Sequence, residues 1–131
     1  MSQPSKDELV QAALEVRSNA YAPYSKFLVG AALVTEYGTV FTGTNVENAS
    51  YGLTICAERV AACTAAAAGH RKILAVAVAT SGGASPCGAC RQFLAEFNGS
   101  MDIYMVDADR PQQVKEMSLA DLLPEQFELE D

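Results

Sequence analysis

The sequence is poor in charged residues, and poorest in basic ones. Only 19% of its 131 residues are charged, and 9 Lys and Arg stand against 16 Asp and Glu, which gives a net charge of −7. Because proteins bind nucleic-acid polymers by neutralising phosphates with Lys and Arg, this balance argues against DNA or RNA as a partner. The low charge content also predicts that part of the surface is buried in an oligomer. A small, uncharged ligand fits the composition better than a polyanion.

Two kinds of segment are also missing. No apolar run approaches the roughly 20 residues of a membrane-spanning helix. Residues 1–9 are polar, without the apolar stretch and small-residue cleavage site of a secretory signal. Without an export signal, the four cysteines indicate a reducing compartment, and metal binding or catalysis in place of disulfides. We therefore expect a cytoplasmic protein with no membrane partner.

The chain length suits one domain, residues 1–131, around one core. Apolar periodicity and turn residues predict helices over 6–19, 54–68, 86–97 and 118–124, and strands over 27–35, 39–44, 73–80, 102–106 and 114–117. The strands over 27–35 and 73–80 are apolar throughout, which is typical of strands covered on both faces. The order of elements therefore predicts an α/β fold, with three α/β/α layers and a mixed, about five-stranded sheet.

Three of the cysteines form a pattern that suits a metal. The chain reads Cys56-Ala57-Glu58 and then, after a gap, Pro-Cys87-Gly-Ala-Cys90. Three thiolates can hold one zinc and leave its fourth position open for water. Glu58 follows the first thiol by two residues, where one carboxylate can move the protons of a hydrolytic reaction. This spacing is a signature of the zinc-dependent nucleobase deaminases.

Two other interpretations of the cysteines fit less well. A structural zinc site would need Cys63 as a fourth ligand, but Cys56 and Cys63 lie two helical turns, about 10 Å, apart. A redox Cys-x-x-Cys pair would leave Cys56 and Glu58 unexplained. We expect Cys63 to be a small buried side chain, and the single histidine, His70, to be a solvated turn residue.

Beyond these residues, the chain resembles the small, homotetrameric, zinc-dependent cytidine deaminases. The resemblance covers nearly the whole chain and rests on motifs at residues 21–25 (YAPYS), 27–32 (FLVGAA), 45–49 (NVENA), 56–59 (CAER), 86–92 (PCGACRQ) and 122–124 (LLP). It implies the cytidine deaminase-like fold, one zinc per chain, and a homotetramer. It also implies hydrolytic deamination of cytidine and deoxycytidine to uridine and deoxyuridine, with release of ammonia, in pyrimidine salvage.

The resemblance also implies a role for individual residues. Cys56, Cys87 and Cys90 would bind the zinc. Glu58 would transfer protons, and Arg59 would moderate the thiolate charge. The implied substrate contacts are Phe27 at the base, Asn45 and Glu47 at the ribose hydroxyls, the Ala57 N–H at the base carbonyl, and Tyr51 and Phe127 at the site of a neighbouring subunit.

Two alternative functions are also compatible with the sequence. Deaminases of cytosine-nucleoside antibiotics, such as blasticidin S, carry similar motifs. The Asn-x-Glu at residues 45–47, followed by Asn-Ala-Ser-Tyr, favours cytidine. The second alternative is a non-catalytic oligomerisation module stabilised by zinc, in which Glu58 would be an ordinary residue of a helix surface.

Overall fold

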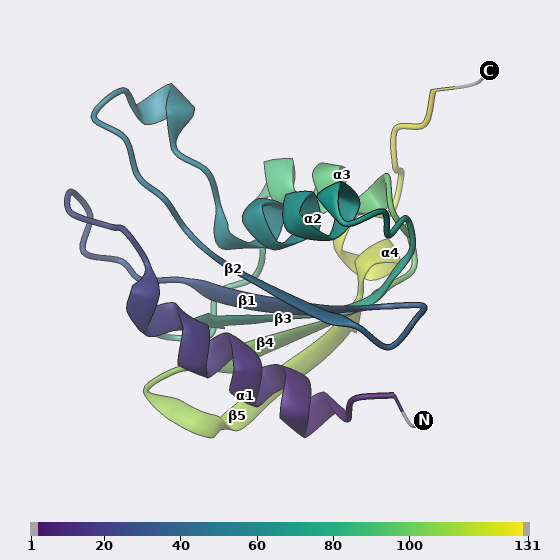
Figure 1. The fold of residues 1–131 in the computed structure, drawn as a ribbon, viewed down its shortest axis with the longest axis horizontal. Coiled ribbons are helices and arrows are strands. Elements are labelled where there is room, and N and C mark those ends of the chain that lie inside the picture. The colour runs from purple at the N-terminus through teal and green to yellow at the C-terminus, as the bar shows by residue number, and fades with distance from the viewer. Residues whose placement is uncertain (1–2, 130–131) are drawn as a thin grey trace.

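A five-stranded sheet forms the centre of the computed structural model, which describes residues 3–129 (Figure 1). The strands are β1 (Gly30–Thr35), β2 (Val40–Thr44), β3 (Ile73–Thr80), β4 (Asp102–Asp107) and β5 (Arg110–Ser118). The helices are α1 (Lys6–Val16), α2 (Ala57–Ala67), α3 (Gly88–Ala95) and α4 (Leu119–Leu122), with 3₁₀ turns η1 (Arg17–Asn19) and η2 (Tyr51–Leu53).

The sheet is mixed, as predicted. Its strand order is β2-β1-β3-β4-β5. Strand β1 is antiparallel to both β2 and β3, β3 is parallel to β4, and β5 is antiparallel to β4. Both strands predicted to be covered on two faces, β1 and β3, lie inside the sheet, and every residue of β1 is buried.

Helices cover both faces of the sheet, which confirms the three layers (Figure 1). Helix α1 packs on one face, where Leu9, Val10 and Ala13 meet side chains of β1 and β3. Helices α2 and α3 lie on the other face, where Leu33 of β1 joins a second cluster with Ala61 of α2 and with residues of α3, β3 and β4. No helix within residues 3–129 is long and apolar enough to cross a membrane.

Helix ends follow the sequence signals in part. Ser5 and Glu8 form a capping box at the start of α1, which begins where the sequence predicted. Gly69, at φ 93°, ends α2 in a Schellman motif, since its N–H donates to the Ala66 carbonyl and the next N–H donates to the Ala65 carbonyl. The predicted start of α2 was too early. Ile55 instead pairs with Val46 in a β-bridge.

The predicted start of α3 and the predicted length of β5 were also wrong. Helix α3 begins after Cys87, so Pro86 lies before the helix and not in its first turn. Strand β5 runs over nine residues in place of the four predicted. It is an edge strand with largely exposed residues. An apolar pattern therefore could not reveal its length, which its pairing with β4 sets.

Two single-residue predictions were wrong. Cys63 is exposed on the outer side of α2 and not buried. His70 is half-buried, its Nδ1 lies 2.8 Å from the hydroxyl of buried Thr35, and its ring packs edge-on against Tyr37 and Phe41. His70 therefore joins the end of α2 to the β1–β2 hairpin, a contact between distant segments that local sequence cannot reveal.

Candidate functional site

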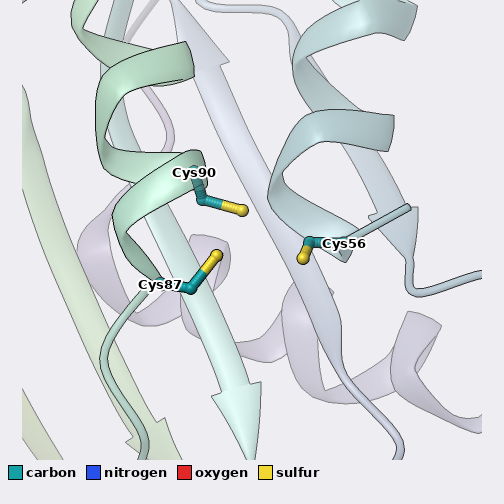
Figure 2. Close-up of side chains that lie close together, drawn as sticks. All are labelled: Cys56, Cys87 and Cys90. Carbon is teal, nitrogen blue, oxygen red and sulfur yellow. The ribbon is translucent and has the colours of Figure 1, made fainter. Parts of the chain in front are cut away.

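Three cysteine sulfurs meet where two helices begin. Cys56 is the N-cap of α2, Cys87 is the N-cap of α3, and Cys90 lies in the first turn of α3. Their sulfur atoms all lie within 4.8 Å of one another and point into the space between the two helices (Figure 2). The positive end of each helix dipole favours thiolates at these positions.

This cluster fits one zinc ion. Tetrahedral zinc with Zn–S bonds of about 2.3 Å holds its sulfurs about 3.8 Å apart, which is compatible with three sulfurs that all lie within 4.8 Å of one another. Within residues 3–129 it is also the one group of three or more potential ligands brought this close together. A fourth sulfur does not join it, because Cys63 lies on the exposed side of α2. The residues present therefore leave a coordination position open.

Arg59 lies beside the cluster. Its Nη2 donates to the Cys56 sulfur over 3.4 Å, while its Nε is buried without a hydrogen-bond partner in the described chain. The pKa of Cys56 falls to about 5, mainly because Cys90 donates a hydrogen bond to its sulfur, with Arg59 adding to the effect. The same contact raises the pKa of Cys90, so one thiolate forms in preference to two.

Glu58 is almost fully enclosed. Only 4% of its surface is exposed, although it lines a cavity that also reaches Cys56 and Cys87. Burial raises the pKa of its carboxyl group, and the negative charge of Cys56 raises it further. A carboxyl group with a raised pKa accepts a proton more readily than an exposed one, which suits a group that carries protons during a reaction.

The cavity beside Glu58 has a volume of about 300 Å³. It brings Glu58 together with six other predicted residues: Phe27, Asn45, Glu47, Cys56, Ala57 and Cys87. Its walls also include residues that were not predicted: Ser25, Val29, Thr54, Val78, Thr80, Ala84 and Ser85. Of these, Thr80 could have been predicted from the sequence. It is the last residue of a strand with a parallel neighbour, and ligands commonly bind at the carboxyl ends of such strands in α/β sheets.

Asn45 supports the segment that carries Phe27. Its amide nitrogen donates to the Phe27 carbonyl over 2.8 Å, and its amide oxygen accepts from the Val29 N–H over 3.0 Å. Each end of the amide retains one hydrogen-bonding position for another partner. Asn45 can therefore contact a ligand while it holds Phe27, which is 43% exposed, at the cavity mouth.

Glu47 is held by the same segment. Its Oε1 accepts from the backbone N–H groups of Tyr24 and Ser25 over 3.0 and 3.1 Å, and the Ser25 hydroxyl donates to Oε2. These bonds, the one from Ser25 Oγ first, lower the pKa of Glu47. The intervening Lys26 has φ 63°, a left-handed conformation that turns the chain from Ser25 toward Phe27.

Two predicted substrate contacts lie outside this cavity. Tyr51 is 79% exposed and lines a neighbouring recess with Tyr24, Ser25, Glu47 and Thr54. Phe127 is 70% exposed and lines another recess beside the end of α3. Both side chains were predicted to contact the site of a neighbouring subunit. Because the structure describes a single chain, both contacts stay predictions.

Comparison with known proteins agrees with this site. The profile of the cytidine and deoxycytidylate deaminase zinc-binding region matches residues 3–106. The chain is 48% identical over 128 residues to the cytidine deaminase of Sporosarcina psychrophila, across 95% of this chain and 93% of that protein. It is 44% identical over 126 residues to the cytidine deaminase of Halalkalibacterium halodurans, across 94% of each.

A solved structure has the same fold. The crystal structure of cytidine deaminase from Burkholderia pseudomallei superposes with a TM-score of 0.88 at 47% sequence identity. The match covers 94% of this chain and 99% of that one. The likeness thus extends over nearly the whole of both chains.

Proposed function

The chain belongs to the cytidine and deoxycytidylate deaminase family, and from this premise we propose that it hydrolyses cytidine and deoxycytidine to uridine and deoxyuridine, releasing ammonia. The observation that carries the proposal is the position of Glu58. Its carboxyl group shares one cavity with the thiols of Cys56 and Cys87, at the edge of the three-cysteine cluster. A non-catalytic zinc module would have no need of an enclosed carboxyl group there.

In the proposed reaction, Cys56, Cys87 and Cys90 would hold one zinc. When bound, zinc supplies the Lewis acidity that makes water nucleophilic near neutral pH. Glu58 takes a proton from the attacking water and gives it to the ring nitrogen next to the carbon under attack. It then transfers the second water proton to the amine as the carbon–nitrogen bond breaks. The products are a carbonyl group and ammonia, and the carboxyl group returns to its starting state.

The remaining cavity residues would hold the nucleoside. Phe27 offers an aromatic face to the base, and Asn45 and Glu47 offer polar atoms to the ribose hydroxyls. Ala57 is the first residue of α2, so its N–H has no carbonyl partner within the helix and can donate to the base carbonyl. The net charge of −7 is compatible with this substrate, which carries no phosphate.

Arg59 would limit the negative charge of the site. Three thiolates and one Zn²⁺ sum to −1, which opposes the loss of a further proton from bound water. A guanidinium that donates to the Cys56 sulfur withdraws part of this charge. We therefore assign Arg59 to charge moderation and not to proton transfer.

We also propose a homotetramer in a reducing compartment, the cytoplasm. Several large apolar side chains near the cavity are exposed in the single chain, among them Tyr21, Val46, Tyr51, Leu53 and Ile55. Burial between subunits would remove this surface from water. In such an assembly Tyr51 and Phe127 would reach a neighbouring cavity. Light scattering on the purified protein measures the mass directly, and a monomer at assay concentration would contradict the proposal.

The test of function is an assay on purified protein of known zinc content. Conversion of cytidine to uridine changes the ultraviolet absorbance, and it should proceed with about one zinc per chain and stop when a chelator removes the metal. Faster turnover of blasticidin S than of cytidine would favour the antibiotic deaminases. Bound zinc without turnover of any of these substrates would favour the structural module.

A further inference from the structure

Arg91 makes four hydrogen bonds around the second and third metal ligands. It lies one residue after Cys90 in α3, and its backbone N–H donates to the Cys87 carbonyl over 2.9 Å. Its side-chain Nε donates to the Pro86 carbonyl over 2.8 Å. The Pro86 carbonyl, which belongs to the Pro86–Cys87 peptide unit, and the Cys87 carbonyl, which belongs to the next unit, are therefore both hydrogen-bonded by the same residue.

The other end of the guanidinium reaches two further segments. Nη2 donates to the Ser85 hydroxyl over 3.0 Å, and Nη1 donates to the Leu122 carbonyl over 2.9 Å. Ser85 lies on the cavity wall, and Leu122 is the last residue of α4, where a carbonyl has no partner within the helix. Arg91 thus connects the cavity loop, the cysteine helix and the C-terminal helix.

The partners of this guanidinium are all neutral. No carboxylate within residues 3–129 forms an ion pair with Arg91. The side chain donates to three neutral acceptors, the Pro86 carbonyl, the Leu122 carbonyl and the Ser85 hydroxyl. Their positions match the rigid, planar arrangement of the guanidinium donors. A lysine ammonium at the same place could not reach all three acceptors from one point. The contacts therefore require arginine for its geometry, beyond its charge.

We propose that Arg91 is a positioning residue for the zinc ligands: it sets the orientation of the Pro86–Cys87 peptide unit and braces it against α4. Figure 2 shows why this unit matters, since Cys87 stands where the irregular segment enters α3 and its sulfur faces Cys56 across the gap. Outer partners of this kind typically change metal affinity by about 10–100-fold. The inference rests on the proposed zinc site, and it adds a residue that touches neither metal nor substrate.

The test measures zinc release from the full-length protein to a chromogenic chelator, alongside the absorption of the cobalt-substituted protein. Arg91→Lys should release zinc about 10–100-fold faster than the wild type and alter the cobalt–thiolate bands. Ser85→Ala, which removes one acceptor and keeps the other three bonds, should have a smaller effect in the same direction. Arg71→Lys is the matched control, because Arg71 also donates to two carbonyls, those of Ala66 and His70, at the far end of α2.

The possible outcomes separate this inference from the proposed function. Wild-type protein without zinc would overturn the proposed function, and this inference with it. Zinc-loaded wild type with unchanged release from Arg91→Lys would overturn only the role of Arg91. The role of Arg91 would also be overturned if metal-free Arg91→Lys had a lower melting temperature but the zinc-release rate and the cobalt spectrum matched those of the wild type. That pattern would indicate that Arg91 only stabilises the fold. Faster release from Arg91→Lys, but not from Arg71→Lys, supports the proposal.

Discussion

Gly43 of β2 packs against the first turn of α2, next to the Ala57 carbonyl. A Cβ atom placed on Gly43 would stand 2.7 Å from that oxygen and 2.5 Å from the Ala61 nitrogen. Real Cβ atoms do not approach backbone atoms this closely. The missing side chain therefore lets α2, with Cys56 and Glu58 at its first turn, rest on the sheet at the depth that the cavity requires.

We expect Gly43→Ala to displace α2 and to weaken the site. The added methyl group must push the helix outward, at a cost of about 1–3 kcal/mol in the free energy of unfolding, as for other overpacked positions. Zinc affinity and turnover should fall together. Gly52→Ala is the control, since a Cβ there would meet nothing within 4 Å. Equal stability and activity of the two variants in urea titration and kinetic assay would contradict this account of α2.

Glu58→Gln tests proton transfer. The amide keeps the size of the side chain but cannot carry a proton between water, ring and leaving amine. We expect kcat to fall by about 10²–10⁴-fold while zinc content and melting temperature stay close to the wild type. Steady-state kinetics and elemental analysis on the same sample measure this. Turnover like that of the wild type would exclude Glu58 as the proton carrier.

Cys87→Ala should abolish stoichiometric zinc binding, because two thiols are too few to hold the metal in place of three. Cys63→Ala provides a matched control on the same kind of residue. Cys63 is exposed and outside the cluster, so its variant should keep about one zinc per chain and full activity. A full zinc complement in Cys87→Ala, or its loss in Cys63→Ala, would show that the ligand set is wrong.

Lys26 tests the turn that presents Phe27. At φ 63° a β-branched side chain is strained, whereas asparagine tolerates the left-handed region. We expect Lys26→Val to be less stable than Lys26→Asn by about 1–2 kcal/mol, and to have a higher KM as Phe27 shifts. Both variants lose the same positive charge, so the comparison isolates backbone conformation. Equal stability and equal KM would argue against a role for this turn.

Asp107 gives the protein a pH-dependent stabilisation away from the cavity. The N–H groups of Gly82 and Asp109 donate to its carboxylate and lower its pKa in the folded state. The unfolded chain therefore binds more protons, so the contribution is complete above about pH 5 and is lost as pH falls through the folded pKa. Urea unfolding from pH 3 to 7 should show a gap between wild type and Asp107→Asn that narrows below about pH 4. A gap of constant size would contradict this.

Local sequence signals located the three clustered thiols and most of the fold. The thiols and Glu58 have fixed spacings along the chain, and such spacings survive folding because each lies within one helix or at its start. Alternation and apolar runs likewise located all five strands. They failed for the length of β5, whose residues are mostly exposed and whose extent depends on its partner strand.

The way in which these parts support one another depends on long-range packing. Asn45 holds Phe27 and Val29, Ser25 holds Glu47, and Arg91 ties the cysteine loop to α4. Each contact joins residues far apart in sequence, and its donors and acceptors find each other only after the strands have paired. The order of residues along the chain specifies which chemical groups the site contains. The packing of α2 and α3 on one sheet determined that those groups meet, because helix position is set by close contacts such as Gly43 with Ala57, which no short-range pattern encodes.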